Sequence, residues 1–289
     1  MLGSNNMGKS IAILYFTDAL EADASIKSAT DIKEALAEQA IMVPLTKDTW
    51  TDRIDALDTK TLCFLATHGE IGEDGTLQAY LELKGFLHTQ STAIASGILA
   101  NKHFTKLVYL SLGIPTPPWV FAGVNYGDGR VDNPLKKMKF GGSKQGIETT
   151  NQIGSDSENI YEQIIPGEFE VIVSVVRDKD RHVPLLPVLR ERSMTVWGEQ
   201  READQTAVPE ETKQNCQEYA QRLSTSLDCY GVTKTDFVIG AKGQIWALET
   251  DAIPGLSRSG GAGEAAKNAG MTYEDLLDMI KETVWKKPN

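Results

Sequence analysis

The stretch from Thr235 to Gly255 constrains the fold of this chain more than any other. Its sequence, TDFVIGAKGQIWALETDAIPG, places the turn-forming residues AKGQ between two apolar runs, which is the pattern of a β-hairpin. Side chains two residues apart in a strand point the same way, so Glu249 and Asp251 share one face, and Asp236 on the partner strand can join them. Three converging carboxylates repel one another unless a cation lies among them, and Mg²⁺ binds carboxylate, phosphate and water oxygens. The hairpin therefore predicts a Mg²⁺–nucleotide site, with scattered surface acids as the alternative.

The charge and cysteine content exclude several classes of protein. The chain has 29 Lys and Arg against 40 Asp and Glu, which gives a formal charge of −11. Nucleic acids and anionic membranes bind basic surfaces, so neither is an expected partner. The 3 cysteines are far apart and form no CxxC, which is typical of free thiols in a reducing compartment. No apolar run approaches the ~18 residues of a membrane span, and no signal peptide is visible at the N-terminus, so we expect a cytoplasmic protein.

Residues 3–10, GSNNMGKS, match the phosphate-loop pattern GxxxxGK[ST]. That loop needs a strand before it and a helix after it, so that backbone N–H groups and a helix N-terminus face the phosphates. Here only two residues precede the motif, and the apolar run that follows it is typical of a strand. We therefore expect an N-terminal extension and no phosphate loop around Lys9.

The first hundred residues predict a doubly wound α/β domain. A strand, a helix and two further strands are expected over Ile11–Phe16, Ser25–Gln39, Ile41–Leu45 and Thr61–Thr67. Ligands of such sheets lie beyond the carboxyl ends of the strands. Glu21 follows the first strand. The loop HGEIGEDG, which holds His68 and Glu73, follows the third, and its glycines let the backbone approach a ligand. A structural role for the lone histidine is the alternative.

Two later segments bear on the site. The basic strand around Lys137 runs into a glycine-rich turn, and Gly141, Gly142 and Gly146 can form a flap whose N–H groups face phosphates. An exposed basic hairpin is the alternative for this flap. The segment Arg190–Glu211 is polar with no clear period, so we expect an irregular loop there. We expect domain boundaries near residues 100 and 175, giving an N-terminal domain over 1–100, a central subdomain over 101–175 and a C-terminal domain over 176–289.

Several blocks, in this order, make the chain resemble the D-alanine–D-alanine ligase-like branch of the ATP-grasp superfamily. They are HGEIGEDGTLQAYLELKG (68–85), NKHFTKLVYLSLGIPTP (101–117), KFGGSKQGI (139–147), TDFVI (235–239) with LETDAIPGLS (248–257), and AAKNAGMTYEDLLDMI (265–280). The resemblance implies an ATP-grasp fold of class α/β (α+β), with a small central lid domain and a C-terminal catalytic domain. It also implies a ligase that forms an acyl phosphate from ATP and a carboxylate, which an amine then attacks.

The resemblance assigns roles to individual residues. The metal ligands, for two Mg²⁺ ions or Mn²⁺ in their place, would be Asp236, Glu249 and Asp251. The ATP contacts would be Lys102 and Lys137 at the phosphates, Glu162 and Ile165 at adenine, Glu168 at the ribose, and Gly141, Gly142 and Ser143 in a loop over the phosphates. Lys234 would stabilise the oxyanion of the tetrahedral intermediate, and Ser143 would face substrate. Glu21, with His68 and Glu73 nearby, would hold the ammonium group of the first amino acid. The second amino acid would lie at Gly255, Ser259 and Gly260.

Departures from the family pattern bear on the substrates. Lys234 stands where the family usually has arginine, and Asp251 where it usually has asparagine. Residues 190–211 contain no tyrosine, and Gly260-Gly261 replaces the usual Ser-Leu pair near the second carboxylate. These changes favour an amino-acid ligase that makes another dipeptide, such as a dipeptide antibiotic. The alternatives are the cell-wall D-alanine–D-alanine ligase, another carboxylate–amine ligase and a non-catalytic ATP-binding regulator. The resemblance also implies a homodimer.

Overall fold

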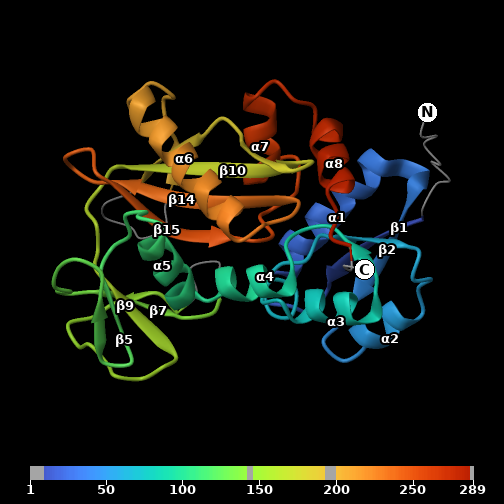
Figure 1. Ribbon diagram of the computed structural model, residues 1–289, viewed down its shortest axis with the longest axis horizontal. Helices are drawn as coiled ribbons and strands as arrows, with labels where there is room; N and C mark the ends of the chain where they lie inside the picture. The colour runs from blue at the N-terminus through green and yellow to red at the C-terminus, as the bar shows by residue number, and fades with distance from the viewer. Residues whose placement is uncertain (1–9, 142–145, 193–199, 287–289) are drawn as a thin grey trace.

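The computed structural model describes residues 10–141, 146–192 and 200–286, which form three β-sheets with helices between and around them (Figure 1). Most of the phosphate-loop pattern, including Lys9, lies outside the described residues, as do Gly142 and Ser143 of the glycine loop. Within the described ranges, no helix is both long and apolar enough to cross a membrane.

The N-terminal sheet, at the right of Figure 1, is parallel and has the strand order β2-β1-β3-β4. The middle strand β1 (Ile11–Phe16) is apolar because it is buried on both faces. The predicted doubly wound architecture is therefore confirmed. The other elements of this region are β2 (Ala40–Leu45), β3 (Leu62–Leu65), β4 (Leu87–His88), α1 (Ala22–Leu36), the 3₁₀ turn Ala37–Gln39, α2 (Trp50–Asp55), α3 (Thr76–Lys84) and α4 (Ala93–Ala100).

Helix α5 (Lys102–Ser111) leads into a small antiparallel sheet with the order β6-β5-β9-β7-β8, at the lower left of Figure 1. The strands of this sheet are short, and β7 agrees with the predicted basic strand, whereas the predicted glycine flap lies partly outside the described residues. Their bounds are β5 (Trp119–Phe121), β6 (Val124–Tyr126), β7 (Leu135–Met138), β8 (Glu148–Thr149) and β9 (Asn159–Glu162).

The third sheet, at the upper left of Figure 1, has the order β13-β12-β10-β14-β15, and β11 also pairs with β10. The long strand β10 (Phe169–Asp178) pairs with β14 over eight residues, so it lies at the middle of the sheet. The remaining elements are β11 (Arg181–Pro184), β12 (Val188–Arg192), β13 (Gln200–Glu202), α6 (Glu210–Ser226), β14 (Val232–Ile239), β15 (Ile245–Asp251), α7 (Gly261–Asn268) and α8 (Tyr273–Glu282).

The expectation of an irregular loop over Arg190–Glu211 was wrong in part. Arg190 and Arg192 pair with β13, an edge strand whose residues are polar, so no apolar alternation marks it in the sequence. The division at residues 100 and 175 remains a proposal. Helix α4 ends at Ala100, whereas β10 runs across residue 175.

The N-terminal and C-terminal sheets share continuous cores. One cluster of buried side chains runs from Leu14 of β1 through Leu99 and Tyr109 to Phe237 of β14. A second joins Ile32 of α1 to the helix α8. Burial of apolar surface across these contacts, at about 25 cal/mol per Å², fixes the carboxyl ends of β1 and β3 beside the β14–β15 hairpin.

Candidate active site

The carboxylates predicted to bind metal lie on one face of the β14–β15 hairpin. In the register of the two strands, Asp236 lies opposite Glu249, and Lys234 lies opposite Asp251. The register shifts directly after Asp236, which marks a β-bulge there. The two-residue alternation of both strands therefore brings three carboxylates and one lysine together, as the sequence predicts.

The charges at this face fit a divalent cation. Burial, together with the nearby carboxylates of Asp251 and Glu249, raises the pKa of Asp236 to about 7 against the attraction of Lys234. The Oδ1 atom of Asp236 is buried and has no hydrogen-bond partner among the described residues. A buried carboxylate oxygen with no partner is costly, and two more carboxylates beside it suit Mg²⁺, a hard ion that prefers oxygen ligands.

Lys234 lies between two of these acids. Its Nζ is 3.0 Å from Asp236 Oδ2 and 3.0 Å from Asp251 Oδ2. Burial acts to lower the pKa of Lys234, but the carboxylates of Asp236, Asp251 and Glu249 outweigh it and raise the pKa well above its ordinary value. Lys234 is therefore a fixed positive charge at the floor of the site.

The first turn of α5 brings a second lysine to the hairpin. Asn101 caps this helix, because its side chain accepts hydrogen bonds from two backbone N–H groups of the first turn. Lys102 Nζ donates to the carbonyl of Gly141 and lies 3.7 Å from Glu249 Oε2. Lys102 thus connects the loop after β7 to the carboxylates of β15.

A second group of side chains lies where β1 and β3 end. His68 Nδ1 is 3.1 Å from Glu73 Oε1, its Nε2 is 3.2 Å from Ser28 Oγ, and its backbone N–H donates to Ser25 Oγ at 2.9 Å. Ligand-type atoms of Glu21, His68 and Glu73 lie within 4.8 Å of one another. Burial raises the pKa of Glu73, and its hydrogen bond with His68 opposes the shift. This end of the site is acidic and suits a cation such as an ammonium group.

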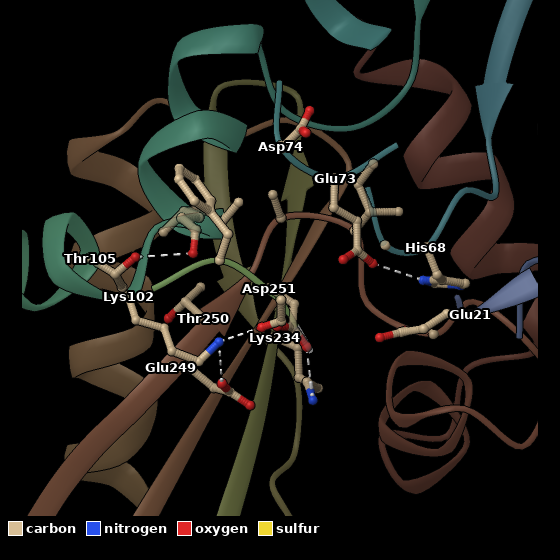
Figure 2. A pocket seen from close by; sticks show the side chains of 18 of the residues that line it. Glu21, His68, Glu73, Asp74, Lys102, Thr105, Lys234, Glu249, Thr250 and Asp251 are labelled. Atoms are coloured by element: carbon tan, nitrogen blue, oxygen red, sulfur yellow. Dashed lines mark hydrogen bonds and ion pairs between the residues drawn. The ribbon is translucent and has the colours of Figure 1, made fainter. Parts of the chain in front are cut away.

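One pocket of about 660 Å³ joins the two groups (Figure 2). Figure 2 shows Glu21, His68 and Glu73 on one side and Lys102 with Glu249 on the other, with Lys234 and Asp251 between them. The predicted site residues that line it are Glu21, His68, Glu73, Lys102, Gly141, Lys234, Asp236, Glu249, Asp251 and Gly255. The structure therefore brings residues that follow β1 and β3 together with residues of α5, β14 and β15.

Other predicted residues do not line this pocket. Lys137 of β7 and Glu162 of β9 form a buried ion pair in the small antiparallel sheet. Glu168 is exposed, and the carbonyl of Ile165 is 3.5 Å from an Arg192 nitrogen that donates to it.

The loop before α7 also lies apart from the lining. Ser259 is exposed, and Gly260 packs so closely that an added Cβ would lie 2.4 Å from the Gly255 carbonyl oxygen. Of the three residues predicted for the second amino acid, Gly255 alone is in the pocket lining.

Sequence reasoning missed three buried polar residues around the site. They are Ser28, which contacts His68, Tyr109, whose hydroxyl is 2.7 Å from Thr250 Oγ1, and Lys106, which contacts Glu162. Lys106 had a signal, since it lies four residues after Lys102 on the helix face that also carries the buried Tyr109. Ser28 had none, because a serine in a helix is common without any such contact.

Comparisons with known proteins agree with this geometry. The family described as "D-ala D-ala ligase C-terminus" matches residues 151–282. The D-alanine–D-alanine ligase of Bordetella pertussis is 28% identical over 303 residues, covering 96% of this chain and 95% of its own. D-alanine–D-alanine ligase A of Bacillus cereus is 29% identical over 273 residues, covering 86% of this chain and 88% of its own.

Solved structures share the fold. The D-alanine–D-alanine ligase of Bacillus anthracis complexed with ATP has a TM-score of 0.76 and 23% identity, covering 95% of this chain and 97% of its own. The VanG D-Ala:D-Ser ligase of Enterococcus faecalis has a TM-score of 0.77 and 19% identity, covering 95% and 99%. The alternative of a non-catalytic regulator is therefore set aside. This chain is similar to the D-alanine–D-alanine ligases of the ATP-grasp superfamily, and the family match with these relatives indicates a carboxylate–amine ligase.

Proposed function

We propose that this protein joins two amino acids into a dipeptide at the expense of ATP, and that D-alanyl-D-alanine is the first product to test. One observation carries the proposal: a single pocket holds a metal-type carboxylate cluster with two lysines at one end and an ammonium-type acidic cluster at the other. Such a pocket can hold a nucleotide phosphate and the carboxylate of an amino acid next to each other.

At the first end, Lys102 binds ATP phosphates. Asp236, Glu249 and Asp251 would hold Mg²⁺, which would supply positive charge to neutralise the phosphates during phosphoryl transfer. The proposal also includes a phosphate contact of Lys137. It includes adenine contacts of Glu162 and Ile165 and a ribose contact of Glu168. The number of ions, two in the family pattern, belongs to it as well.

At the other end, Glu21 binds the ammonium group of the first amino acid, and the His68–Glu73 pair fixes the surrounding charge. The carboxylate oxygen of this amino acid attacks the γ-phosphorus, ADP leaves, and an acyl phosphate forms. The amine of the second amino acid then attacks the acyl carbon and loses a proton, and inorganic phosphate leaves. Lys234 stabilises the negative oxygen of the tetrahedral intermediate, since its charge persists at the floor of the pocket.

The relatives favour D-alanine as both substrates, because the curated proteins described above are named D-alanine–D-alanine ligases. A dipeptide with another second amino acid is the second candidate. The observation in its favour is the loop at Gly260, where no side chain fits against the Gly255 carbonyl. A serine hydroxyl at this position would need another backbone path, so the second carboxylate must be held differently. Dipeptide-antibiotic synthesis has no support among these relatives and is not proposed.

The test is a coupled assay with purified protein, ATP and Mg²⁺. D-alanine should release phosphate, and mass spectrometry should identify D-alanyl-D-alanine. Next, D-alanine is combined with each other D- or L-amino acid, and then all remaining pairs of D- and L-amino acids are tested. Product with D-alanine and another acceptor would select the second candidate. Normal nucleotide binding without amide product from any pair would contradict the proposed function. Size-exclusion chromatography with light scattering tests the expected homodimer.

A further inference from the structure

Outside the pocket lining, side chains of α5, β7 and β9 form a buried cluster of charges: Lys106, Lys137 and Glu162. Glu162, at the end of β9, is 3% exposed, and each of its carboxylate oxygens contacts a different lysine. Oε1 is 2.5 Å from Lys137 Nζ of β7, and Oε2 is 2.8 Å from Lys106 Nζ of α5. Two lysines thus share one carboxylate, and the cluster carries one positive charge in excess.

Lys106 is held firmly in this cluster. Besides its ion pair with Glu162, its Nζ donates to Thr116 Oγ1 at 2.5 Å and to the Pro117 carbonyl at 3.1 Å. The Thr116 hydroxyl donates onward to the Ala247 carbonyl of β15. The ammonium also lies 5.1 Å from the centre of the Trp119 ring, within cation–π range.

Lys137 is held much less. Its Nζ makes one hydrogen bond within the described part of the chain, to Glu162, so two of its N–H bonds are available. Lys137 also lies on the strand that leads directly to Phe140 and Gly141, which line the pocket. Lys137 is therefore the lysine of the cluster that can donate to a further ligand.

We propose that Lys106 is a positioning residue for nucleotide binding: it keeps a permanent ion pair with Glu162, so that Lys137 can leave this carboxylate and bind a phosphate of ATP. This inference rests on the proposed function, because it takes Lys137 as a phosphate ligand.

The reason lies in the cost of a stranded charge. A buried carboxylate that loses its last partner is strongly destabilised. With Lys106 present, Glu162 remains paired when Lys137 turns to a phosphate. Without Lys106, Lys137 would be the sole counter-ion of Glu162 and would stay there. Both groups are charged at neutral pH: burial lowers the pKa of Lys106 only to about 8, and the two lysines overcome the burial of Glu162 and lower its pKa to about 2.

The experiment compares nucleotide binding by the full-length protein and four variants, namely Lys106→Met, Glu162→Gln, the double variant of these two, and Lys136→Met. Calorimetric titration with Mg²⁺ and a non-hydrolysable ATP analogue gives the dissociation constant without turnover. Lys106→Met should weaken binding by about tenfold or more, which is the scale of a lost charged contact. In turnover, KM for ATP should rise by a similar factor, while KM for the amino acids and kcat at saturating ATP change less than about threefold.

The double variant Lys106→Met/Glu162→Gln separates positioning from a structural role. Glu162→Gln alone removes the carboxylate that retains Lys137, so it is the reference for the double variant, which should bind the analogue within about threefold of Glu162→Gln. If Lys106 only supports the fold, Lys106→Met will weaken binding as much in the Glu162→Gln background as in the unmodified protein, and the inference is overturned. Lys136→Met, which removes the neighbouring lysine of the surface pair with Glu148, is the matched control and should change neither constant.

Folding is checked by thermal unfolding of each variant. If Lys106→Met does not fold at the assay temperature, Lys106→Gln replaces it, since its amide can still donate hydrogen bonds to Thr116 and Pro117. Unchanged nucleotide binding by a folded Lys106 variant contradicts the inference. Failure of the proposed function has a different signature: the unmodified protein binds the analogue but forms no amide with any amino-acid pair.

Discussion

At the scale of single residues, the metal site depends on charge balance between near neighbours. Lys234 contacts two carboxylates that face the same pocket, and Asp236 has a buried oxygen without a partner. The acids and the lysine hold one another in place, but they leave ligand capacity for a cation. An arginine in place of Lys234 would offer a planar fork, whereas Lys234 offers one compact charge.

Glu249→Gln tests the metal assignment. The amide keeps the shape of the side chain but removes one negative charge, so Mg²⁺ should bind more weakly and kcat/KM should fall by about 100-fold or more. Activity is measured over a range of Mg²⁺ concentrations, and excess Mg²⁺ should restore part of it. Asp55→Asn, which removes an exposed acid paired with Lys84, is the control and should keep normal turnover. Turnover of Glu249→Gln within threefold of normal, at limiting Mg²⁺, would sink the assignment.

Glu21→Gln tests the other end of the pocket. Loss of a charge-assisted hydrogen bond costs about 1.5–3 kcal/mol, so KM for the first amino acid should rise by roughly 10- to 100-fold. KM for ATP should not change, because the nucleotide lies at the other end. Glu34→Gln on the exposed side of α1 is the matched control. An equal rise in both Michaelis constants would remove Glu21 from the amino-acid site.

The sequence predicted site residues that lie on one hairpin better than residues whose partners lie on distant elements. Asp236, Glu249 and Asp251 were predictable because strand alternation is short-range and the hairpin turn is local. Lys106 could not be assigned a role, because its partners Thr116 and Glu162 belong to other elements, and only the packed fold brings them to one atom. Gly260 appeared as a replacement for serine, but its close approach to Gly255 depends on the path of the loop.

At the scale of elements, patterns that depend on burial were predicted well. The apolar run of β1 lies where the sequence indicated, and α8 begins with a capping box formed by Thr272 and Asp275. The edge strand β13 was missed because its polar residues lack alternation, and α4 was not predicted as a helix because its residues are small and apolar all round. Single-sequence patterns thus find half-buried elements more readily than exposed or fully apolar ones.

The ion pairs that join α5, β7 and β9 should make the free energy of unfolding depend on pH. Glu162 has a pKa lowered to about 2 in the folded protein, so its ion pairs stabilise the fold fully above about pH 4.5, and this contribution is lost as the pH falls toward 2. Lys106 has a pKa lowered to about 8, so its contribution has the opposite trend and stability rises as the pH rises from about 8 to 10.5.

Urea unfolding from pH 3 to 10 measures both slopes. The free energy of unfolding of the unmodified protein should fall more steeply below pH 4.5 than that of Lys106→Met/Glu162→Gln. Above pH 8 it should rise relative to that of the double variant. If the free energies of unfolding of the two proteins change equally with pH, the cluster does not contribute to the pH dependence of stability.

At the scale of the whole molecule, the pocket is assembled from elements that are far apart in the sequence. Glu21 and His68 follow strands of the N-terminal sheet, Lys102 begins α5, and Asp236 and Glu249 come from the C-terminal sheet. Shared cores hold the two larger sheets together, and Lys102 contacts both Gly141 after β7 and Glu249 of the hairpin. A ligand in the pocket therefore contacts parts of the chain that are far apart in the sequence.

Nucleotide binding should consequently stabilise the entire protein. A ligand at 100 times its dissociation constant adds about 2.7 kcal/mol to the free energy of unfolding, which for a chain of this size raises Tm by roughly 5 °C. Differential scanning fluorimetry with Mg²⁺ and a non-hydrolysable ATP analogue measures the shift. Chelation of the metal, or the Glu249→Gln change, should remove most of it, because the phosphates then lose their bridge to the hairpin. A full shift without the metal would mean that the nucleotide binds apart from the carboxylates, and a single transition at every nucleotide concentration would show that the three sheets unfold together.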